Sequence, residues 1–292
     1  MKKEAKSQSL TEGRRCVWMK AGVINYKLCP YNYACNICPF DKGIRDGNVR
    51  KPEQYRKITW VEKLRELPGT ERYCRHMLQG LVSFKLCSHN YECGTCPYDQ
   101  MVEDRLGDAV LPEMRRIAGF RITPTYHYHP KHSWVHVEYG AKCRVGFDDF
   151  ALQILGPNYA FELPRIGQPV KQNEPFMKVR AADRDFELQA PMDGVISAVN
   201  PLHRITHELE PYSDGWVAII EPGKRILPNM KKLYYGEKAL EWTSESADRL
   251  FEQLSPEDRV TAADGGLLLP ETFQRMAPER HAQLIEDVVL GG

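Results

Sequence analysis

The chain has 292 residues, is 42% hydrophobic and 27% charged, and carries a formal net charge of +1 at pH 7. This composition is that of a folded protein of about two domains, and it excludes a largely disordered chain. No apolar run approaches the roughly 18 residues that a membrane-spanning helix needs, so we expect no membrane association. Residues 1–8 are charged and lead into no apolar segment, which predicts a cytoplasmic protein rather than a secreted one.

The charge is unevenly distributed along the chain. Residues 1–122 contain 22 Lys and Arg against 14 Asp and Glu, whereas residues 123–292 contain 18 against 25. A basic segment can indicate nucleic-acid binding. Two zinc ions, each held by four thiolates, would lower the charge of the first segment by about 4 and remove half of its excess. We therefore do not expect a nucleic-acid partner.

A cysteine-rich segment occurs twice near the start of the chain. Residues 16–41 align without gaps on residues 74–99, at an offset of 58. Both copies read Cys, twelve residues, Cys, five residues, Cys, two residues, Cys, and then Pro, an aromatic residue and Asp. Shared residues between the cysteines, such as Asn32 and Asn90, indicate a duplicated module.

Each copy has the cysteine spacing of a metal site. A Cys-x-x-Cys turn brings two sulfurs within reach of one ion, and modules this small need metal binding to supply folding energy. The predicted ligands are Cys16, Cys29, Cys35 and Cys38 in the first module and Cys74, Cys87, Cys93 and Cys96 in the second. Zn²⁺ at two sites is the favoured cofactor. A [4Fe–4S] cluster stays open as the alternative, because Cys-Pro at the last ligand also occurs in bacterial ferredoxins.

Two histidines lie inside the second module but are not predicted ligands. His76 and His89 align with the aromatic residues Trp18 and Tyr31 of the first copy, so we expect them to be surface or packing residues. Apolar spacing predicts a helix over residues 56–67 and a second helix over residues 100–117, interrupted near Gly107.

From about residue 123 to 223 the sequence changes to short apolar runs broken by Gly and Pro. Runs at residues 134–139, 160–163, 176–179 and 194–199 predict strands of a small sandwich or barrel. The histidines at 127, 129, 132 and 136 are expected to lie on the surface of this domain. Cys143, which has no partner in the repeat, is predicted to be a small core residue.

Motifs in this region indicate a family. Residues 132–135 read His-Ser-Trp-Val, residues 161–167 read Phe-Glu-Leu-Pro-Arg-Ile-Gly, and residues 211–216 read Pro-Tyr-Ser-Asp-Gly-Trp. With Ala-Pro-Met-Asp-Gly-Val-Ile at residues 190–196, these segments resemble the glycine cleavage system H protein in unbroken order. The resemblance implies the lipoyl-domain fold, with two small antiparallel sheets, over residues 123–223.

The chemistry that the resemblance implies depends on one lysine, which carries lipoate at the tip of a β-hairpin in a Glu-Ser-Val-Lys-Ala type of segment. In this chain Asp183 takes the place of that lysine and Arg180 takes the place of the glutamate. A carboxylate cannot form the amide to lipoate, so lipoate is not expected. Lys178, five residues before the tip, is the nearest lysine and leaves lipoylation at an unusual position as an alternative.

The tail is predicted to be helical, over residues 237–254 and again over residues 270–290 with an interruption at Pro278. The sequence therefore predicts an α+β protein with an H-protein-like antiparallel β sandwich, connecting helices and a helical tail. Its expected parts are a first four-cysteine module (1–58), a second module with its helix (59–122), the β domain (123–223) and the tail (224–292).

No set of nucleophile, base and acid stands out, and no glycine-rich phosphate loop is present, so we do not expect an enzyme. The predicted function is that of an adaptor or regulatory protein with two metal sites and a docking domain that has lost its lipoyl site. The expected partner is a protein such as a lipoate-handling or redox enzyme. An iron–sulfur electron carrier and a glycine cleavage carrier lipoylated at an unusual lysine stay open as alternatives.

Overall fold

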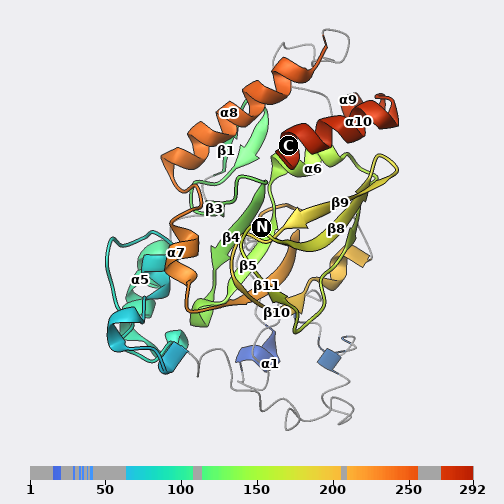
Figure 1. Ribbon diagram of the computed structural model, residues 1–292. Coiled ribbons are helices and arrows are strands. Elements are labelled where there is room, and N and C mark those ends of the chain that lie inside the picture. Colours follow the sequence, from blue (N-terminus) through green and yellow to red (C-terminus); the bar gives the residue numbers. More distant parts are fainter. Residues whose placement is uncertain are drawn as a thin grey trace, which may run out of the picture. The chain divides into compact units, whose positions relative to one another are not determined.

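The computed structural model describes residues 16–20, 29, 33, 35, 38, 40–41, 64–107, 114–204, 209–255 and 271–291 (Figure 1). Contacts divide the chain into two compact units, residues 1–59 and residues 60–292. In the first unit the helix with described bounds is α1 (Val17–Lys20), and the second unit contains the sheets. No helix within the described ranges is both long enough and apolar enough to cross a membrane.

In the part of the chain that the structure describes, the β structure consists of two antiparallel sheets and a short ribbon. The larger sheet has six strands in the order β3 (His127–Tyr128), β4 (Ser133–Val137), β5 (Cys143–Phe147), β11 (Trp216–Pro222), β10 (Gly194–Val199) and β7 (Pro169–Val170). The smaller sheet has the order β6 (Ala160–Glu162), β8 (Pro175–Ala181) and β9 (Arg184–Gln189). The ribbon pairs β1 (Arg115–Ile117) with β2 (Phe120–Ile122).

The four strands predicted from apolar runs are present as β4, β6, β8 and β10, and residues 194–199 coincide with β10. The larger sheet has more strands than the small sheet that was expected. β11 lies at its centre and joins β5 to β10. β11 reads as a nearly continuous apolar run, and its residues are buried except for a half-buried Glu221. It pairs with β5 on one side and β10 on the other, which is the usual setting of such a run.

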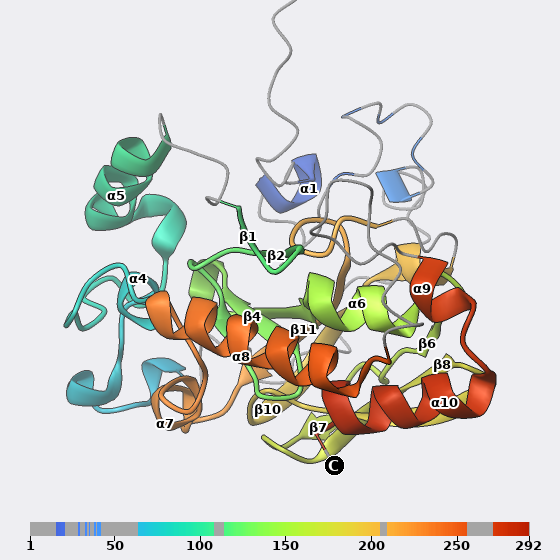
Figure 2. The same cartoon turned by 90° about the horizontal axis from the view of Figure 1, so that it is seen from above.

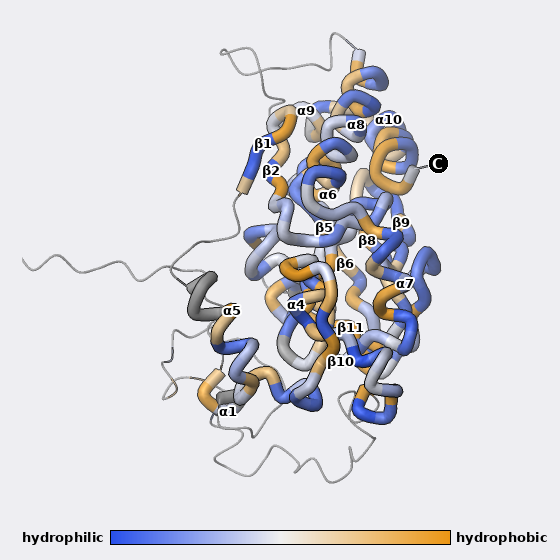
Figure 3. Tube along the Cα trace, turned by 90° about the vertical axis from the view of Figure 1, so that its left-hand side faces the viewer, coloured by the Kyte–Doolittle hydropathy of each residue, from blue (hydrophilic) through white to orange (hydrophobic). Residues whose placement is uncertain are grey.

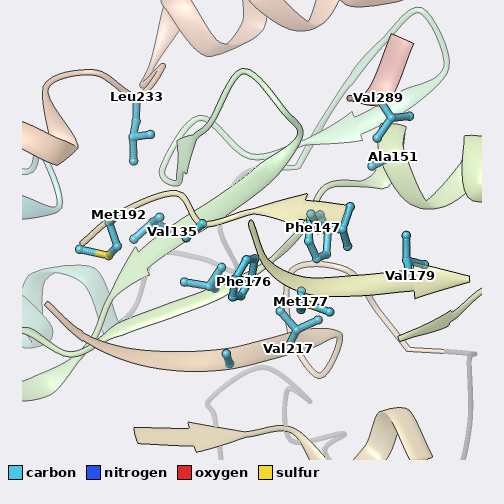
Figure 4. Close-up of a cluster of buried hydrophobic side chains, with 14 of the residues drawn as sticks. Val135, Phe147, Ala151, Phe176, Met177, Val179, Met192, Val217, Leu233 and Val289 are labelled. Atoms are coloured by element: carbon cyan, nitrogen blue, oxygen red, sulfur yellow. The ribbon is translucent and has the colours of Figure 1, made fainter. Parts of the chain in front are cut away.

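The apolar core of the β domain lies between the two sheets and the C-terminal end of the chain. Figure 4 shows side chains of both sheets in one cluster, among them Val135 and Val217 of the larger sheet and Val179 of the smaller one. Val289, close to the C-terminal end, belongs to the same buried cluster. The last residues of the chain therefore close the core of the β domain.

A tryptophan over a glycine fixes the pairing of β4 with β5. Trp134 is fully buried, and its indole Nε1 donates to the carbonyl oxygen of Phe147 at 3.0 Å. The ring occupies the space where residue 146 would have a side chain: a Cβ there would lie 2.4 Å from Cζ2 of Trp134. Gly146 is therefore required by close approach of the ring.

The helices follow from their caps and apolar faces. The described helical segments of the second unit outside the cysteine module are η5 (Tyr139–Ala141), α6 (Asp149–Leu155), η6 (Pro201–Arg204), α7 (Ile226–Met230), α8 (Glu237–Gln253), α9 (Glu271–Gln274), α10 (Pro278–Leu284) and η7 (Ile285–Val289). Asp148 caps α6 by accepting a hydrogen bond from the backbone of Ala151 at 2.8 Å. Pro278 is the first residue of α10, so a new helix begins where the sequence predicted an interruption.

Helix α8 packs on the β domain through one tryptophan. The ring of Trp242 lies 5.9 Å from that of Tyr128 on β3 and stacks on Tyr234 at 5.2 Å. Figure 2 shows α8 and α10 on the same side of the sheets, and Figure 3 shows hydrophilic and hydrophobic segments alternating along both helices. The apolar face predicted for residues 237–254 thus packs against the β domain.

One predicted helix is shorter than expected. The segment predicted as a helix over residues 100–117 contains the end of α5 (Pro97–Gly107) and then β1, so its last three residues form a strand. Ala118 and Gly119 both have positive φ, 49° and 95°, which makes the two-residue turn that pairs β1 with β2. Of the helix predicted over residues 56–67, residues 56–63 lie outside the described residues, and residues 64–65 are helical.

Three of the four histidines predicted to lie on the surface are buried, which corrects that prediction. His127, His129 and His132 are 7%, 2% and 1% exposed. His127 stacks on Tyr235 at 4.4 Å between ring centroids, and burial lowers its pKa to about 3. The sequence could not indicate this, because the segment that covers β3 leads into α8, about a hundred residues later.

Replacing Gly146 by alanine should lower the free energy of unfolding by about 1–3 kcal/mol, because the indole of Trp134 cannot move aside without losing its bond to Phe147. Urea denaturation followed by tryptophan fluorescence measures the change. Gly223→Ala is the matched control: no atom lies within 4 Å of its added Cβ, so its stability should stay within about 0.5 kcal/mol of the wild type. Equal stability of the two variants would contradict the packing argument.

Candidate functional sites

The hairpin formed by β8 and β9 ends in a two-residue turn. Ala181 pairs with Arg184 across the hairpin, and Ala182 and Asp183 between them have φ values of 46° and 59°. Two consecutive left-handed residues are typical of the tight turn that matches the twist of a hairpin. The structure therefore places Asp183 at the exposed tip, where the resemblance located the lipoyl position.

Arg180 is directly opposite Asp185 in the hairpin, and the two side chains form a two-pronged ion pair. Nε of Arg180 lies 2.7 Å from Oδ1 of Asp185, and Nη2 lies 2.8 Å from Oδ2. The pair raises the pKa of the arginine and lowers the pKa of the aspartate. Both side chains are exposed, so the pair fixes side-chain geometry more than it stabilises the fold.

Lys178 lies in the middle of β8, with its side chain on the exposed face of the smaller sheet. Its register partners are Glu162 on β6 and Glu187 on β9. The nearest lysine to the tip is therefore flanked by two carboxylate residues within a strand. A long arm attached there would start from the face of the sheet rather than from a projecting turn.

The turn lies close to the C-terminal helices (Figure 1). Nη1 of Arg184, the first residue of β9, is 4.0 Å from Oε1 of Glu286 on η7. Arg184 thus brings one charged side chain of the turn beside η7, and Asp183 and Asp185 are exposed. No lysine is present between residues 179 and 223, so no amine is available on the turn.

The second cysteine module is built from short elements: η3 (Gly69–Glu71), α4 (Arg75–Leu78), η4 (Cys93–Thr95) and the start of α5. Cys74 is the N-cap of α4, and its amide donates to the carbonyl of Lys85 at 2.9 Å. This backbone pairing brings the segment of Cys74 beside that of Cys87. The Cys93–Cys96 pair closes a turn, with the amide of Cys96 donating to the carbonyl of Cys93 at 3.1 Å.

All four cysteines of this module line one pocket. Their thiols are free, so the structure contains no disulfide among them. Within the described part of the chain, no group of three or more His, Cys, Asp and Glu side chains is arranged to hold a metal ion. The four predicted ligands thus line one pocket, and both the four-thiolate site and its metal stay predictions.

Backbone amides point at the sulfurs of this pocket. The amide of Tyr91 donates to Sγ of Cys87 at 3.2 Å. Burial raises the pKa of the Cys74 thiol, and amide donors at the start of α4 oppose that rise. Burial also raises the pKa of Cys93 to about 11, against a hydrogen bond from the amide of Gly140. Such donors stabilise thiolates and orient them for a ligand.

A buried aspartate of the second module, Asp99, is hydrogen-bonded to two side chains of helix α4. Asp99, three residues after Cys96, accepts hydrogen bonds from Nε of Arg75 at 2.5 Å and from Nε2 of His76 at 2.9 Å. Arg75, His76 and Asp99 are each at most 5% exposed. His76 is therefore a packing residue that donates to a carboxylate, as predicted from its alignment with Trp18. His89 contacts Thr95 rather than a sulfur, at 3.2 Å.

The first module repeats these local bonds at the offset of 58. Nε1 of Trp18 donates to Oδ1 of Asp41 at 2.7 Å, as His76 does to Asp99. The amide of Tyr33 donates to Sγ of Cys29 at 3.2 Å, as Tyr91 does to Cys87. Cys16 and Cys38 are buried, and Cys29 and Cys35 are half-buried. Most residues between these cysteines lie outside the described residues.

The second module and the β domain meet at the turn between β4 and β5. Nε2 of Gln79 donates to the carbonyl of Val137 at 2.6 Å. At the same turn, Glu138 forms an ion pair with Arg144 at 3.0 Å and lies 3.2 Å from Nδ1 of His136. Burial alone would raise the pKa of Glu138, but Arg144 and then His136, with a smaller effect of Arg75, lower it to about 2.

The ninth cysteine is separate from this pocket. Cys143 lies in β5, is fully buried, and is not among the residues that line the pocket of the second module. Burial raises the pKa of its thiol well above the ordinary value. It is a small core residue, as predicted.

Comparison with known proteins identifies relatives of the β domain. The family described as "Glycine cleavage H-protein" matches residues 126–246. The chain is 40% identical over 98 residues to the glycine cleavage system H protein of Geobacillus thermodenitrificans, covering 32% of this chain and 76% of that protein. It is 35% identical over 121 residues to that of Bacillus subtilis, covering 40% of this chain and 93% of that protein.

A crystal structure of a glycine cleavage system H protein from Mycobacterium marinum is also similar, at 28% identity and a TM-score of 0.31, and the match covers 35% of this chain and 86% of that chain. The family match extends through α7 and into α8 and ends at residue 246. It lies wholly after the eight cysteines of the repeat, so these similarities concern the β domain and the first part of the tail.

Stability should fall in acid through Glu138. Its folded pKa of about 2 is below the unfolded value of 4.5, so its contribution is complete above about pH 4.5 and is lost as the pH falls towards 2. Glu138→Gln should therefore destabilise the chain at pH 7 by a quantity on the order of 3 kcal/mol, and by less than half of that at pH 3. Urea denaturation at both pH values measures the difference.

The control for this pH series is Glu187→Gln, which replaces an exposed carboxylate on β9. Its effect should stay within about 0.5 kcal/mol of the wild type at both pH values. A destabilisation by Glu138→Gln that is the same at pH 3 and pH 7 would show that the carboxylate charge at this junction is not what stabilises it.

Proposed function

The chain belongs to the glycine cleavage H-protein family through residues 126–246, and on that basis we propose that it is a non-enzymatic docking or regulatory protein whose H-protein-like domain carries no lipoate. The observation that carries the proposal is Asp183 at the tip of the β8–β9 hairpin. The relatives found are named as H proteins of the glycine cleavage system, which are carriers and not catalysts.

The chemistry of attachment supports this proposal. Lipoate is joined to a carrier through an amide bond, which requires an amine nucleophile on the carrier. Asp183 offers a carboxylate there, and Arg180, in place of the family glutamate, is held in its ion pair with Asp185. Lys178 has an amine, but it lies inside β8 between the registers of Glu162 and Glu187. No tip residue of this hairpin can therefore take the acyl group.

The domain keeps its packing although its tip has changed. The hydroxyl of Tyr126 donates to the carbonyl of Tyr212 at 2.9 Å, and the hydroxyl of Tyr212 donates to the carbonyl of Arg121 at 2.8 Å. These bonds tie the Pro-Tyr-Ser-Asp-Gly-Trp motif to the start of the domain, and the ring of Trp134 packs beside them. This framework supports the proposal that the domain still offers a docking surface to a partner of H proteins.

The partner in this proposal is an enzyme that handles lipoate or that binds H proteins in a glycine cleavage system. In place of an acylated lysine, the tip presents the carboxylate of Asp183 and the guanidinium of Arg184, both exposed. The chain would bind such an enzyme without delivering an arm to its active site, and so compete with a working carrier. In this proposal, each of the two cysteine modules binds metal through four thiolates, and the metal stabilises the fold of the N-terminal part of the chain.

The chain produced in a host that lipoylates its own H protein should show no lipoyl adduct by intact mass. The double substitution Arg180→Glu and Asp183→Lys restores the charges of the family hairpin and should produce an adduct on residue 183, because the turn geometry is already in place. Lys178→Arg is the control and should likewise show no lipoyl adduct. An adduct on the wild-type chain that disappears in Lys178→Arg would instead establish a carrier with a displaced attachment site.

Docking can be tested by competition with a working carrier. Purified lipoate-handling enzymes should capture the full chain, and excess lipoylated H protein should reduce that capture by about tenfold, since both would use the same surface. Asp183→Ala with Arg184→Ala should weaken capture several-fold, whereas Lys224→Ala, on an exposed loop after β11, should not. Capture that excess H protein leaves unchanged would exclude a shared docking surface.

A further inference from the structure

The segment formed by α10 and η7 presents one apolar face to the β domain. Its buried residues repeat at helical spacing, at positions 281, 282, 284, 285, 288 and 289. The other residues from 278 to 290 are exposed or half-buried. η7 packs against α6 and α8, and Figure 4 shows Val289 near Ala151 of α6. We name residues 278–291 the strap; it binds the β domain as an amphipathic helix binds a partner.

The strap lies outside the part of the chain that matches the H-protein family. The family match ends at residue 246, within α8, and the strap begins at residue 278. The match with the Bacillus subtilis protein takes up 93% of that protein, which leaves little of it for a counterpart. In a domain without this addition, the apolar side chains beneath the strap would face solvent or a partner. Exposed apolar patches of this kind mark interaction sites.

Hydrogen bonds hold the strap near both of its ends. Nε2 of His281, near its start, donates to the carbonyl oxygen of Ile154 at the end of α6, at 2.6 Å. Nζ of Lys131, in the turn between β3 and β4, donates to the carbonyl oxygens of Leu290 and Gly291. The strap is therefore fixed to the domain by a short set of polar contacts on either side of its apolar face.

The last turn of the strap is wound as a π-helix. The amide of Leu290 donates to the carbonyl of Ile285, five residues earlier, at 3.1 Å. π-helical turns are rare and are frequently found at functional sites. With this winding Val288 and Val289 are both buried, whereas Glu286 keeps its side chain 46% exposed.

The strap also reaches the tip of the β8–β9 hairpin. Oε1 of Glu286 is 4.0 Å from Nη1 of Arg184, and the side chain of Arg184 is 52% exposed. Arg184 is one of the two charged residues that the proposed function offers to a partner. An exposed ion pair at this distance contributes little to stability. A carboxylate of a partner can therefore replace Glu286 at Arg184, and in this structure the strap holds that place.

We propose that the strap is a displaceable internal ligand of the H-protein-like domain and inhibits docking at the hairpin tip. The face that it covers binds an acidic amphipathic helix of the partner once the strap has left. This class of partner follows from the strap itself, which combines an apolar face with Glu286 and Asp287 on its half-buried side. The inference rests on the docking role in the proposed function and adds its regulation. It is independent of the cysteine modules.

A first experiment tests the strap without any partner. A protease site inserted between Ala262 and Ala263 of the full chain allows the tail to be cut after folding. The cut fragment should stay bound in gel filtration, and an excess of a fluorescein-labelled peptide of residues 271–291 should exchange with it, which raises the fluorescence anisotropy. The uncut chain should take up at least about tenfold less peptide, because the tether keeps the strap at a high effective concentration.

The same peptide carrying Ile285→Asp is the control and should bind at least about tenfold more weakly, because residue 285 is fully buried. Exchange that requires enough urea to unfold the β domain would overturn the proposal, since the strap would then be a part of the core. A peptide that does not bind, or that binds equally well with Ile285→Asp, would also overturn it.

A second experiment tests inhibition of docking. Val288→Ala with Val289→Ala weakens the apolar contact of the strap, and capture of this variant by purified lipoate-handling enzymes should rise several-fold. The cut chain, whose fragment can leave, should show the same rise without any substitution in the strap. Val195→Ala, which shortens an exposed valine on β10, is the matched control and should leave capture unchanged.

Equal capture of the wild type, the double variant and the cut chain would overturn the inhibition while leaving the docking role in place. Capture of none of them would contradict the docking role together with its regulation. In that case exchange of the labelled peptide would still establish the strap as an internal ligand, so the two failures are distinguishable.

Discussion

The antiparallel pairing of β4 with β5 is the constraint on which the rest of residues 60–292 depends. Within the β domain, the indole of Trp134 packs directly over Gly146 and donates to the carbonyl of Phe147. This packing is possible because residue 146 has no side chain. At the other end of the hairpin, Val137 and Gly140 offer a carbonyl and an amide to the cysteine module. The same two strands thus pack the core and carry the module, and the ion pair of Glu138 with Arg144 neutralises charge at that junction.

The β8–β9 hairpin shows why a site can change while its domain persists. Val179 and Phe186 of the hairpin face the core and are at most 4% exposed, whereas Arg180, Asp183 and Asp185 face solvent. Core packing restricts the inward residues, and nothing in the packing restricts the outward ones. A lipoyl position is therefore free to become a carboxylate without loss of the fold, and the ion pair across the hairpin preserves a well-defined tip. What differs from a carrier is the chemistry of that surface and not its architecture.

The second cysteine module is built differently from the β domain: four half-buried cysteines line its pocket, beside buried apolar side chains such as Leu78 and Tyr91. The aspartate that follows each Cys-Pro pair is explained by its buried bond to the ring nitrogen of Trp18 or His76. This bond accounts for two features of the repeat that spacing alone left open: the role of the aspartate, and the exchange of histidine for tryptophan at a position that is not a ligand. Strained residues such as Tyr91 then direct backbone amides at the sulfurs.

The sequence by itself determined the features that depend on local pattern: the strands β4, β6, β8 and β10, the amphipathic face of α8, the family of the β domain, and the position of Asp183 at a hairpin tip. These follow from periodicity, turn chemistry and motif order, which are written in consecutive residues. Only the tertiary structure decided the features that depend on distant segments meeting. The burial of His127 under Tyr235 and of His132 against Trp242 requires contacts between residues about a hundred positions apart in the chain. The lining of one pocket by four cysteines requires separate segments of the second module to meet. No local pattern encodes these contacts.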